Sequence, residues 1–155
     1  NLRYVSDIMR RDSQTVTPDT PVEDVIRIID TDDIQRVAVV ATDGRFLGLI
    51  ADRDLLAAFA GKGFGFWEYL SCKLSFKTSH ECSRELRKTL REKTAGEVMK
   101  TGLVMVGEST GIEEAIHLMV DKRLKRLPVV DAEGRFRGMI SRDALLKQTG
   151  IAPGA

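Results

Sequence analysis

The chain has 155 residues, of which 43% are hydrophobic and 30% charged, with 24 lysines and arginines against 23 aspartates and glutamates. The net charge of +1 excludes the broad basic surface that nucleic acids or anionic membranes bind, so any anion site must be local. Two cysteines cannot form a disulfide framework, and no apolar run is long enough to span a bilayer. We therefore expect a cytoplasmic protein without membrane insertion.

The first thirty residues predict a short turn, a strand and a helix. Residues 7–9 favour one helical turn, and residues 15–17 an extended run that Pro18 ends, because proline carries no N–H for a ladder. Apolar residues then recur at helical spacing. We predict Thr20 as the N-cap of this helix, with Glu23 three positions later completing a capping box.

Two strands and a second helix follow. Residues 36–40 and 46–50 are rich in β-formers, and Asp43-Gly44 between them favours a tight hairpin turn, which predicts antiparallel pairing. The second helix begins at Asp52, where a negative charge favours the positive end of the helix dipole, and Gly61 ends it.

The same unit recurs 90 residues later without a gap. Gly44-Arg45-Phe46 aligns with Gly134-Arg135-Phe136, and the matches extend from Met9 with Met99 to Leu55 with Leu145. A unit of about 60 residues is marginal alone, so we expect the two copies to share a core and leave a cleft between them. The predicted organisation is a first repeat over residues 1–60, an insert over 61–93, a second repeat over 94–150 and a tail over 151–155.

The insert and one basic run have more than one interpretation. Aromatic and leucine side chains of the insert recur at helical spacing, which favours a helix that covers a core edge or a dimer contact over a private ligand pocket; they are Trp67, Leu70 and Leu74. Cys72, His80 and Cys82 could surround a metal, but they lack the second donor pair of a structural zinc site. Residues 122–126 are the densest basic run. A solvated helix C-terminus explains it better than an anion-binding patch.

The order of the elements, with a hairpin, a glycine and a helix-opening acid in fixed places, resembles the CBS domain, and the tandem resembles a CBS pair, or Bateman module. The likeness is carried by Val37 to Val40 and Gly48 to Asp54 in the first copy, and by Leu127 to Val130 and Gly138 to Ala144 in the second. The resemblance implies an α+β fold of two β-α-β-β-α repeats, packed as a pseudo-twofold pair with a helical insert between them.

The function that the resemblance implies is regulatory binding without catalysis. Such pairs bind AMP, ADP, ATP or S-adenosylmethionine in the cleft and signal occupancy to an attached or partner protein, and they require no cofactor. In the family a Ser or Thr begins the last helix, and an Asp three residues later holds the ribose hydroxyls. The first copy has Asp54 but Ala51, whereas the second has Ser141 but Ala144, with Asp143 one residue early. We therefore expect the first site to bind the nucleotide.

Polar candidates can be weighed by their chemistry. An ionised carboxylate accepts hydrogen bonds from two vicinal hydroxyls, which supports Asp54, whereas Asp52 is explained equally well as a helix-start acid. Phosphate groups require cations or free N–H groups. The phosphate candidates are Arg53 and Arg142, each in a first helical turn, and then the equivalent pair Arg36 and Arg126.

The remaining candidates are residues that the resemblance implies and one residue next to them in the sequence. The resemblance implies that a set of apolar strand residues contacts the adenine base, although such residues could equally be ordinary core residues of the sheets. They are Val16, Ala38, Val39, Ile50, Val106, Pro128 and Ile140, with Thr17 next to the first of them. Ser141, Arg142 and Asp143 would belong to the second site.

The predicted partners are a small-molecule nucleotide, a second copy in a homodimer, and a fused or separate effector domain. Because position 1 is asparagine, we expect the chain to be part of a longer protein. Two alternatives stay open. One is a structural or dimerisation module with vestigial clefts and no nucleotide, and the other is an enzyme or metal protein centred on the insert.

Overall fold

The computed structural model describes residues 3–31, 36–59, 88 and 90–148. Contacts divide the chain into two units. Unit 1 comprises residues 1–13, 43–46 and 103–155, and unit 2 comprises residues 14–42 and 47–102. The leading segment of each repeat therefore belongs to the unit that is built on the other repeat. Trp67, Leu70, Leu74, Cys72, His80 and Cys82 lie outside the described residues.

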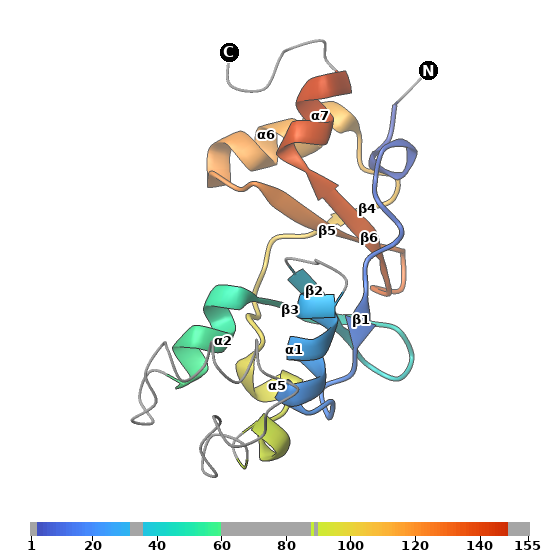
Figure 1. Cartoon of the computed structure of the whole chain (residues 1–155). Helices are drawn as coiled ribbons and strands as arrows, with labels where there is room; N and C mark the ends of the chain where they lie inside the picture. Colours follow the sequence, from blue (N-terminus) through green and yellow to red (C-terminus); the bar gives the residue numbers. More distant parts are fainter. Residues whose placement is uncertain (1–2, 32–35, 60–87, 89, 149–155) are drawn as a thin grey trace. The chain divides into compact units, whose positions relative to one another are not determined.

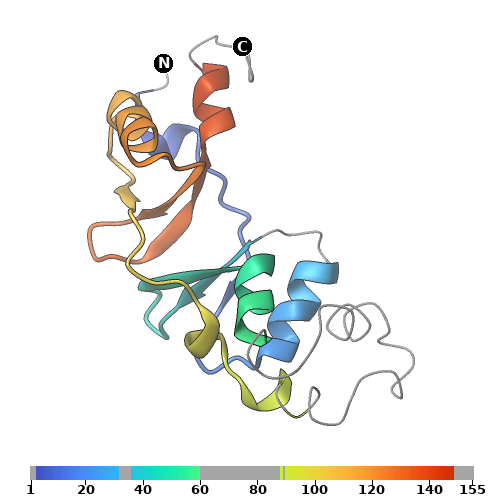
Figure 2. The same cartoon turned by 90° about the vertical axis from the view of Figure 1, so that its left-hand side faces the viewer.

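The first repeat forms a three-stranded sheet in the order β1-β2-β3, with β1 parallel to β2 and Val16 opposite Val39. Two helices lie on one side of this sheet (Figures 1 and 2). The elements of this repeat are β1 (Thr15–Val16), α1 (Val22–Thr31), β2 (Arg36–Val40), β3 (Phe46–Ala51) and α2 (Asp52–Phe59). The short helix α5 (Ala95–Val98) opens the second repeat but belongs to unit 2.

The second repeat has the same plan. Its sheet has the order β4-β5-β6, with β4 parallel to β5 and β5 antiparallel to β6. The elements of this repeat are β4 (Val106–Gly107), α6 (Ile112–Lys122), β5 (Arg126–Val130), β6 (Phe136–Ser141) and α7 (Arg142–Gln148). The short turn of helix η1 (Val5–Asp7) opens the first repeat but belongs to unit 1. The predicted α+β class and the order strand, helix, strand, strand, helix are confirmed in both repeats.

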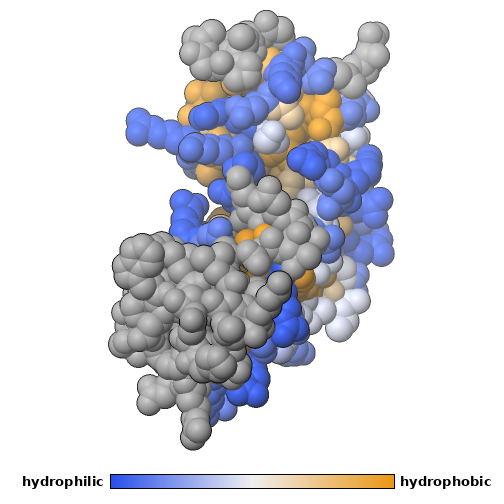
Figure 3. Space-filling view, in the orientation of Figure 1, coloured by the Kyte–Doolittle hydropathy of each residue, from blue (hydrophilic) through white to orange (hydrophobic). Residues whose placement is uncertain are grey.

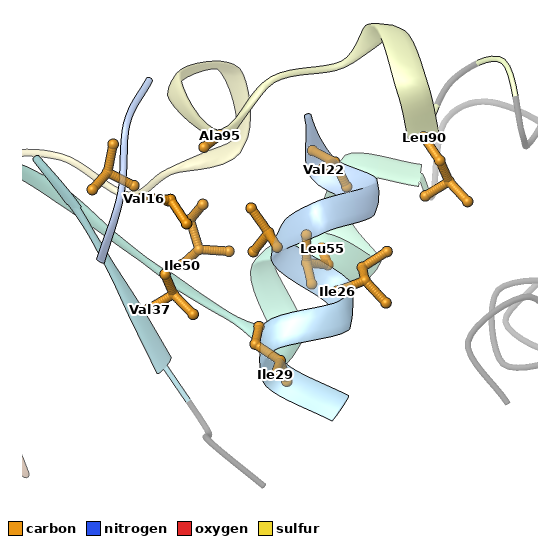
Figure 4. Packing of buried hydrophobic residues seen from close by; sticks show 11 residues of the cluster. Val16, Val22, Ile26, Ile29, Val37, Ile50, Leu55, Leu90 and Ala95 are labelled. Carbon is orange, nitrogen blue, oxygen red and sulfur yellow. The ribbon is translucent and has the colours of Figure 1, made fainter. Parts of the chain in front are cut away.

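Each unit has its own apolar core. In unit 2 the helical spacing of α1 brings its apolar residues onto the sheet, where they pack with β1, β2, β3 and Leu55 of α2 (Figure 4). Leu90 and Ala95 complete this cluster. In unit 1 the equivalent cluster joins α6, α7 and the strands to Val5 and Met9 from the start of the chain.

The two leading segments, residues 3–10 and 93–100, dock in the same way. The N–H of Val22 donates to the carbonyl of Lys93 at 2.8 Å, and the N–H of Ile112, 90 positions later, donates to that of Arg3 at 3.1 Å. At the other end of each segment, one residue exchanges both backbone hydrogen bonds with a strand. These pairs are Lys100 with Leu49, and Arg10 with Met139.

These docked segments explain why a glycine recurs at positions 48 and 138. A Cβ on Gly48 would lie 2.5 Å from the carbonyl oxygen of Lys100, and one on Gly138 would meet the carbonyl oxygen of Arg10. Real Cβ atoms do not approach a backbone oxygen this closely. The repeated glycine therefore lets the docked segment reach the strand at hydrogen-bonding distance.

The predicted N-cap of the first helix is wrong. α1 begins at Val22, and the Thr20 hydroxyl instead accepts a hydrogen bond from the N–H of Thr17 at 3.1 Å. Thr110 bonds the N–H of Gly107 in the same way, at 3.0 Å. A side-chain cap is not needed, because the carbonyl of the docked segment already takes the N–H at the helix start.

Candidate functional site

The apolar candidates are buried in the two sheets. Val16, Val39 and Ile50 belong to the core of unit 2, where they are at most 7% exposed, and Val106 and Ile140 belong to the core of unit 1. Their side chains therefore already pack against the helices of their own unit.

Ala38 and Pro128 differ from the other apolar candidates. Both are buried, yet each lies between two strand residues whose side chains belong to the core cluster, so its own side chain points to the opposite face of the sheet. Thr17 follows the core residue Val16 and is partly buried. Its hydroxyl lies 3.1 Å from that of Thr20.

The start of α2 presents three charged candidates. Asp52 and Arg53 are exposed, and Asp54 is partly buried. The Oδ2 atom of Asp54 accepts a hydrogen bond from the N–H of Ala51 at 2.8 Å. No other hydrogen bond to this carboxylate comes from the described residues, so among them its Oδ1 atom has no donor.

The start of α7 is held differently. The hydroxyl of Ser141 accepts a hydrogen bond from the N–H of Ala144 at 3.1 Å. Arg142 and Asp143 are exposed. Arg126, the second-tier phosphate candidate of this repeat, lies opposite Ser141 in the β5–β6 ladder, whereas its counterpart Arg36 begins β2. Both arginines are partly buried.

Each of these two helix starts has one half of a capping box, and the two halves differ. In a complete box, the residue before the helix bonds the N–H three positions on, and the acid at that position bonds back. The first repeat has only the returning bond, from Asp54, and the second has only the forward bond, from Ser141. The complete spacing Ser/Thr-x-x-Asp is also a capping-box pattern, but each repeat has only one of its two residues, so the sequence does not indicate these bonds.

Metal and membrane chemistry have no support in the part of the chain that the structure describes. No group of three or more His, Cys, Asp or Glu side chains there could hold a metal ion. No helix in the same residues is long and apolar enough to cross a bilayer.

The fold and the paired helix starts define a tandem module built from one duplicated unit. The family model for the CBS domain matches residues 5–61 and 95–149. The chain therefore belongs to the CBS-domain family and contains a pair of CBS domains.

Relatives and solved structures agree with this assignment. The chain is 29% identical over 141 residues to the CBS domain-containing protein CBSX1, chloroplastic, of Arabidopsis thaliana. The match covers 89% of this chain and 59% of that protein, so the chain spans well under two thirds of this relative.

Among the similar solved structures are complexes with AMP and with ATP. The crystal structure of CBSX2 in complex with AMP is 25% identical, with a TM-score of 0.67, and the match covers 94% of this chain and 95% of that one. The cytosolic domain of the Mg²⁺ channel MgtE in complex with ATP is also 25% identical, with a TM-score of 0.68, over 94% of this chain and 48% of that one.

Proposed function

We propose that this CBS pair is a regulatory module that binds an adenine nucleotide at the start of α2 in the first repeat, without catalysis. The observation that carries the proposal is the carboxylate of Asp54, which is fixed at Oδ2 by the N–H of Ala51 and accepts no hydrogen bond at Oδ1 from the described residues. The AMP and ATP complexes of the two similar structures support the ligand class.

Asp54 has the chemistry to orient a ribose. Because Oδ2 already accepts from the N–H of Ala51, the carboxylate has a fixed direction, and Oδ1 can accept from a sugar hydroxyl in a charge-assisted hydrogen bond. Arg53 is exposed in the same helical turn and can pair with a phosphate. The second repeat has Ala144 in place of the acid and lacks this acceptor.

Occupancy would act by population shift. A nucleotide stabilises the conformation that it binds better, and the signal cannot exceed that difference in affinity. An attached or separate effector would sense the change, and a homodimer would present two such sites. No cofactor or bond-breaking step is part of the proposal.

Isothermal titration calorimetry with AMP, ADP, ATP and S-adenosylmethionine tests the proposal. We compare the parent chain with Asp54→Asn, because asparagine can still accept the hydrogen bond from Ala51 but has no charge. We expect a loss of affinity of about tenfold or more, since a charged acceptor is roughly twice as strong as a neutral one.

Asp143→Asn is the matched control, because Asp143 is an exposed acid in the first turn of the equivalent helix. We expect it to leave the affinity unchanged. Equal losses in both variants would contradict the site at α2. An absence of binding to any of these compounds at millimolar concentration would instead favour the structural or dimerisation module, for which the divided capping box is the supporting observation.

A further inference from the structure

The segment that docks on the first repeat, residues 93–100, ends in a lysine. Lys100 exchanges both backbone hydrogen bonds with Leu49 of β3, at 2.8 and 3.1 Å, and it is an exposed residue. Directly opposed residues of an antiparallel pair point their side chains to the same face of a sheet. The side chain of Lys100 therefore lies on the same face of this sheet as that of Leu49.

This face of the sheet is turned away from the core of unit 2. Ile50 packs in the core cluster, and successive strand residues alternate between faces, so Leu49 and Ala51 point to the opposite side. Two residues of a strand span about 7 Å, which separates Leu49 from Ala51 along β3. Ala51 in turn donates its N–H to Asp54. The docked segment thus brings a cation to the strand that leads directly into the proposed ligand site.

The equivalent cation of the other docked segment is already paired. Arg10, 90 positions before Lys100, exchanges backbone hydrogen bonds with Met139 in the same way, at 2.8 and 3.0 Å. Its Nη2 atom lies 2.9 Å from Oδ2 of Asp12. The counterpart of Asp12 in the segment of Lys100 is Gly102, which has no carboxylate to offer. Within the part of the chain that the structure describes, Lys100 forms no ion pair.

The difference between these two cations follows the difference between the two helix starts. The repeat that has Asp54 receives the unpaired Lys100, whereas the repeat that has Ala144 receives Arg10, whose charge a carboxylate already balances. Hydrophilic residues are spread over the described surface of the chain, so an exposed cation by itself is ordinary (Figure 3). Here, however, an acceptor for ribose hydroxyls and an unpaired cation for a phosphate belong to the same unit, unit 2.

We propose that Lys100 binds a phosphate of the nucleotide whose ribose is held by Asp54, an inference that rests on the proposed function. The ammonium group would form a charge-assisted hydrogen bond with the phosphate from the docked segment, while Arg53 approaches it from α2. Because this contact exists only while residues 93–100 are docked, the nucleotide stabilises the docking. The segment that leads into the second repeat would therefore sense the occupancy of the first.

Calorimetry with adenosine and AMP tests this inference, because the two ligands differ by a single phosphate group. Lys100→Gln removes the charge and keeps a long polar side chain. We expect this variant to bind AMP about tenfold more weakly than the parent chain and to bind adenosine equally well, since only AMP has a phosphate. Lys100→Arg keeps a cation and should retain most of the AMP affinity. The difference between the parent and Lys100→Gln should shrink as salt is added.

Arg10→Gln is the matched control, because Arg10 has the equivalent position on the other docked segment and pairs with Asp12. It should leave both affinities unchanged. Asp54→Asn should instead weaken adenosine and AMP alike, because both ligands have the ribose. Lys100 is bonded to β3 through its backbone, so Lys100→Gln should melt at the same temperature as the parent chain.

Other results would overturn the role of Lys100. Full AMP affinity in Lys100→Gln would make Lys100 an ordinary solvated lysine, and the proposed function would stand. Equal losses for adenosine and AMP in that variant would assign the effect to the docked segment and not to a phosphate contact. Equal affinities of the parent chain for the two ligands would show that the phosphate is not bound. A parent chain that binds neither ligand would overturn the proposed function and this inference together.

Discussion

The two repeats form the same backbone hydrogen bonds with their docked segments, but they have different residues at the start of the last helix. The hydrogen bonds of the docked segments recur 90 residues apart, as do the glycines over which these segments cross. At the start of the last helix, the first repeat has Ala51 and Asp54, and the second has Ser141 and Ala144. Either half of a capping box therefore satisfies the fold.

This difference separates structural from functional requirements inside one chain. Positions that both copies keep, such as Gly48 and Gly138, are those that steric contact demands. Positions that differ are free of that demand, so the carboxylate of Asp54 calls for another explanation. The proposed ligand site lies at such a position.

The largest predicted effect concerns the shared glycines. Gly48→Ala and Gly138→Ala should each lower the free energy of unfolding by about 3 kcal/mol, because the new methyl group displaces a docked segment from the strand. Chemical denaturation measures this loss. Limited proteolysis should show faster cleavage near Lys100 in the first variant and near Arg10 in the second.

Gly107→Ala is the control for these substitutions. Its added Cβ would lie 3.7 Å from the nearest heavy atom, which is an ordinary contact, and the first repeat has Thr17 at the equivalent position. We expect little change in stability. A loss as large as that of the other two variants would show that backbone freedom, and not the close approach, explains why glycine recurs at positions 48 and 138.

A smaller effect tests the divided capping box. Ser141→Ala removes the acceptor for the N–H of Ala144, and Asp54→Ala removes the acceptor for the N–H of Ala51. Each should lower the free energy of unfolding by about 1 kcal/mol. If Asp54→Ala raises stability instead, the carboxylate is not a useful cap, and the protein keeps it at a cost that only ligand binding explains.

Much of the fold could be predicted from the sequence. Residue spacing and turn-forming residues predict the offset of 90 residues, the order of the elements and the hairpin turn at Gly44. Gly44 indeed has a φ of +93°. The docking of each leading segment on the other repeat was not visible. Because Met9 and Met99 are equivalent, as are the surfaces that receive them, either pairing satisfies the same apolar pattern.

The candidate site was harder to predict. The central strands are apolar on both faces, so sequence alternation does not separate residues that pack on the helices, such as Val39, from those that face away, such as Ala38. The capping role of Asp54 and Ser141 was hidden for another reason. Each repeat has only one of the two residues of the pattern, and the hydrogen bond that each of them forms is seen only in the folded structure.

The smallest predicted effect compares the two leading segments at low pH. The carboxylate of Asp7 accepts hydrogen bonds from the N–H groups of Tyr4 and Arg3, both at 3.0 Å, and these bonds hold the pKa of Asp7 below its ordinary value, with that of Tyr4 contributing most. A lowered pKa in the folded state means that Asp7 stabilises the fold at higher pH. This contribution is complete above about pH 4 and is lost as the pH falls through the folded pKa.

NMR titration of the Tyr4 and Arg3 amide protons measures this effect. Both signals should shift together, with a midpoint below the ordinary pKa of aspartate, and Asp7→Asn should abolish the transition. In the other segment Glu97 bonds the N–H of Thr94 at 3.2 Å, so Glu97→Gln provides the matched variant. It should leave the Tyr4 transition unchanged, because Glu97 belongs to unit 2 and Tyr4 to unit 1. A midpoint at the ordinary value in the parent chain would mean that the carboxylate does not hold the first segment in solution.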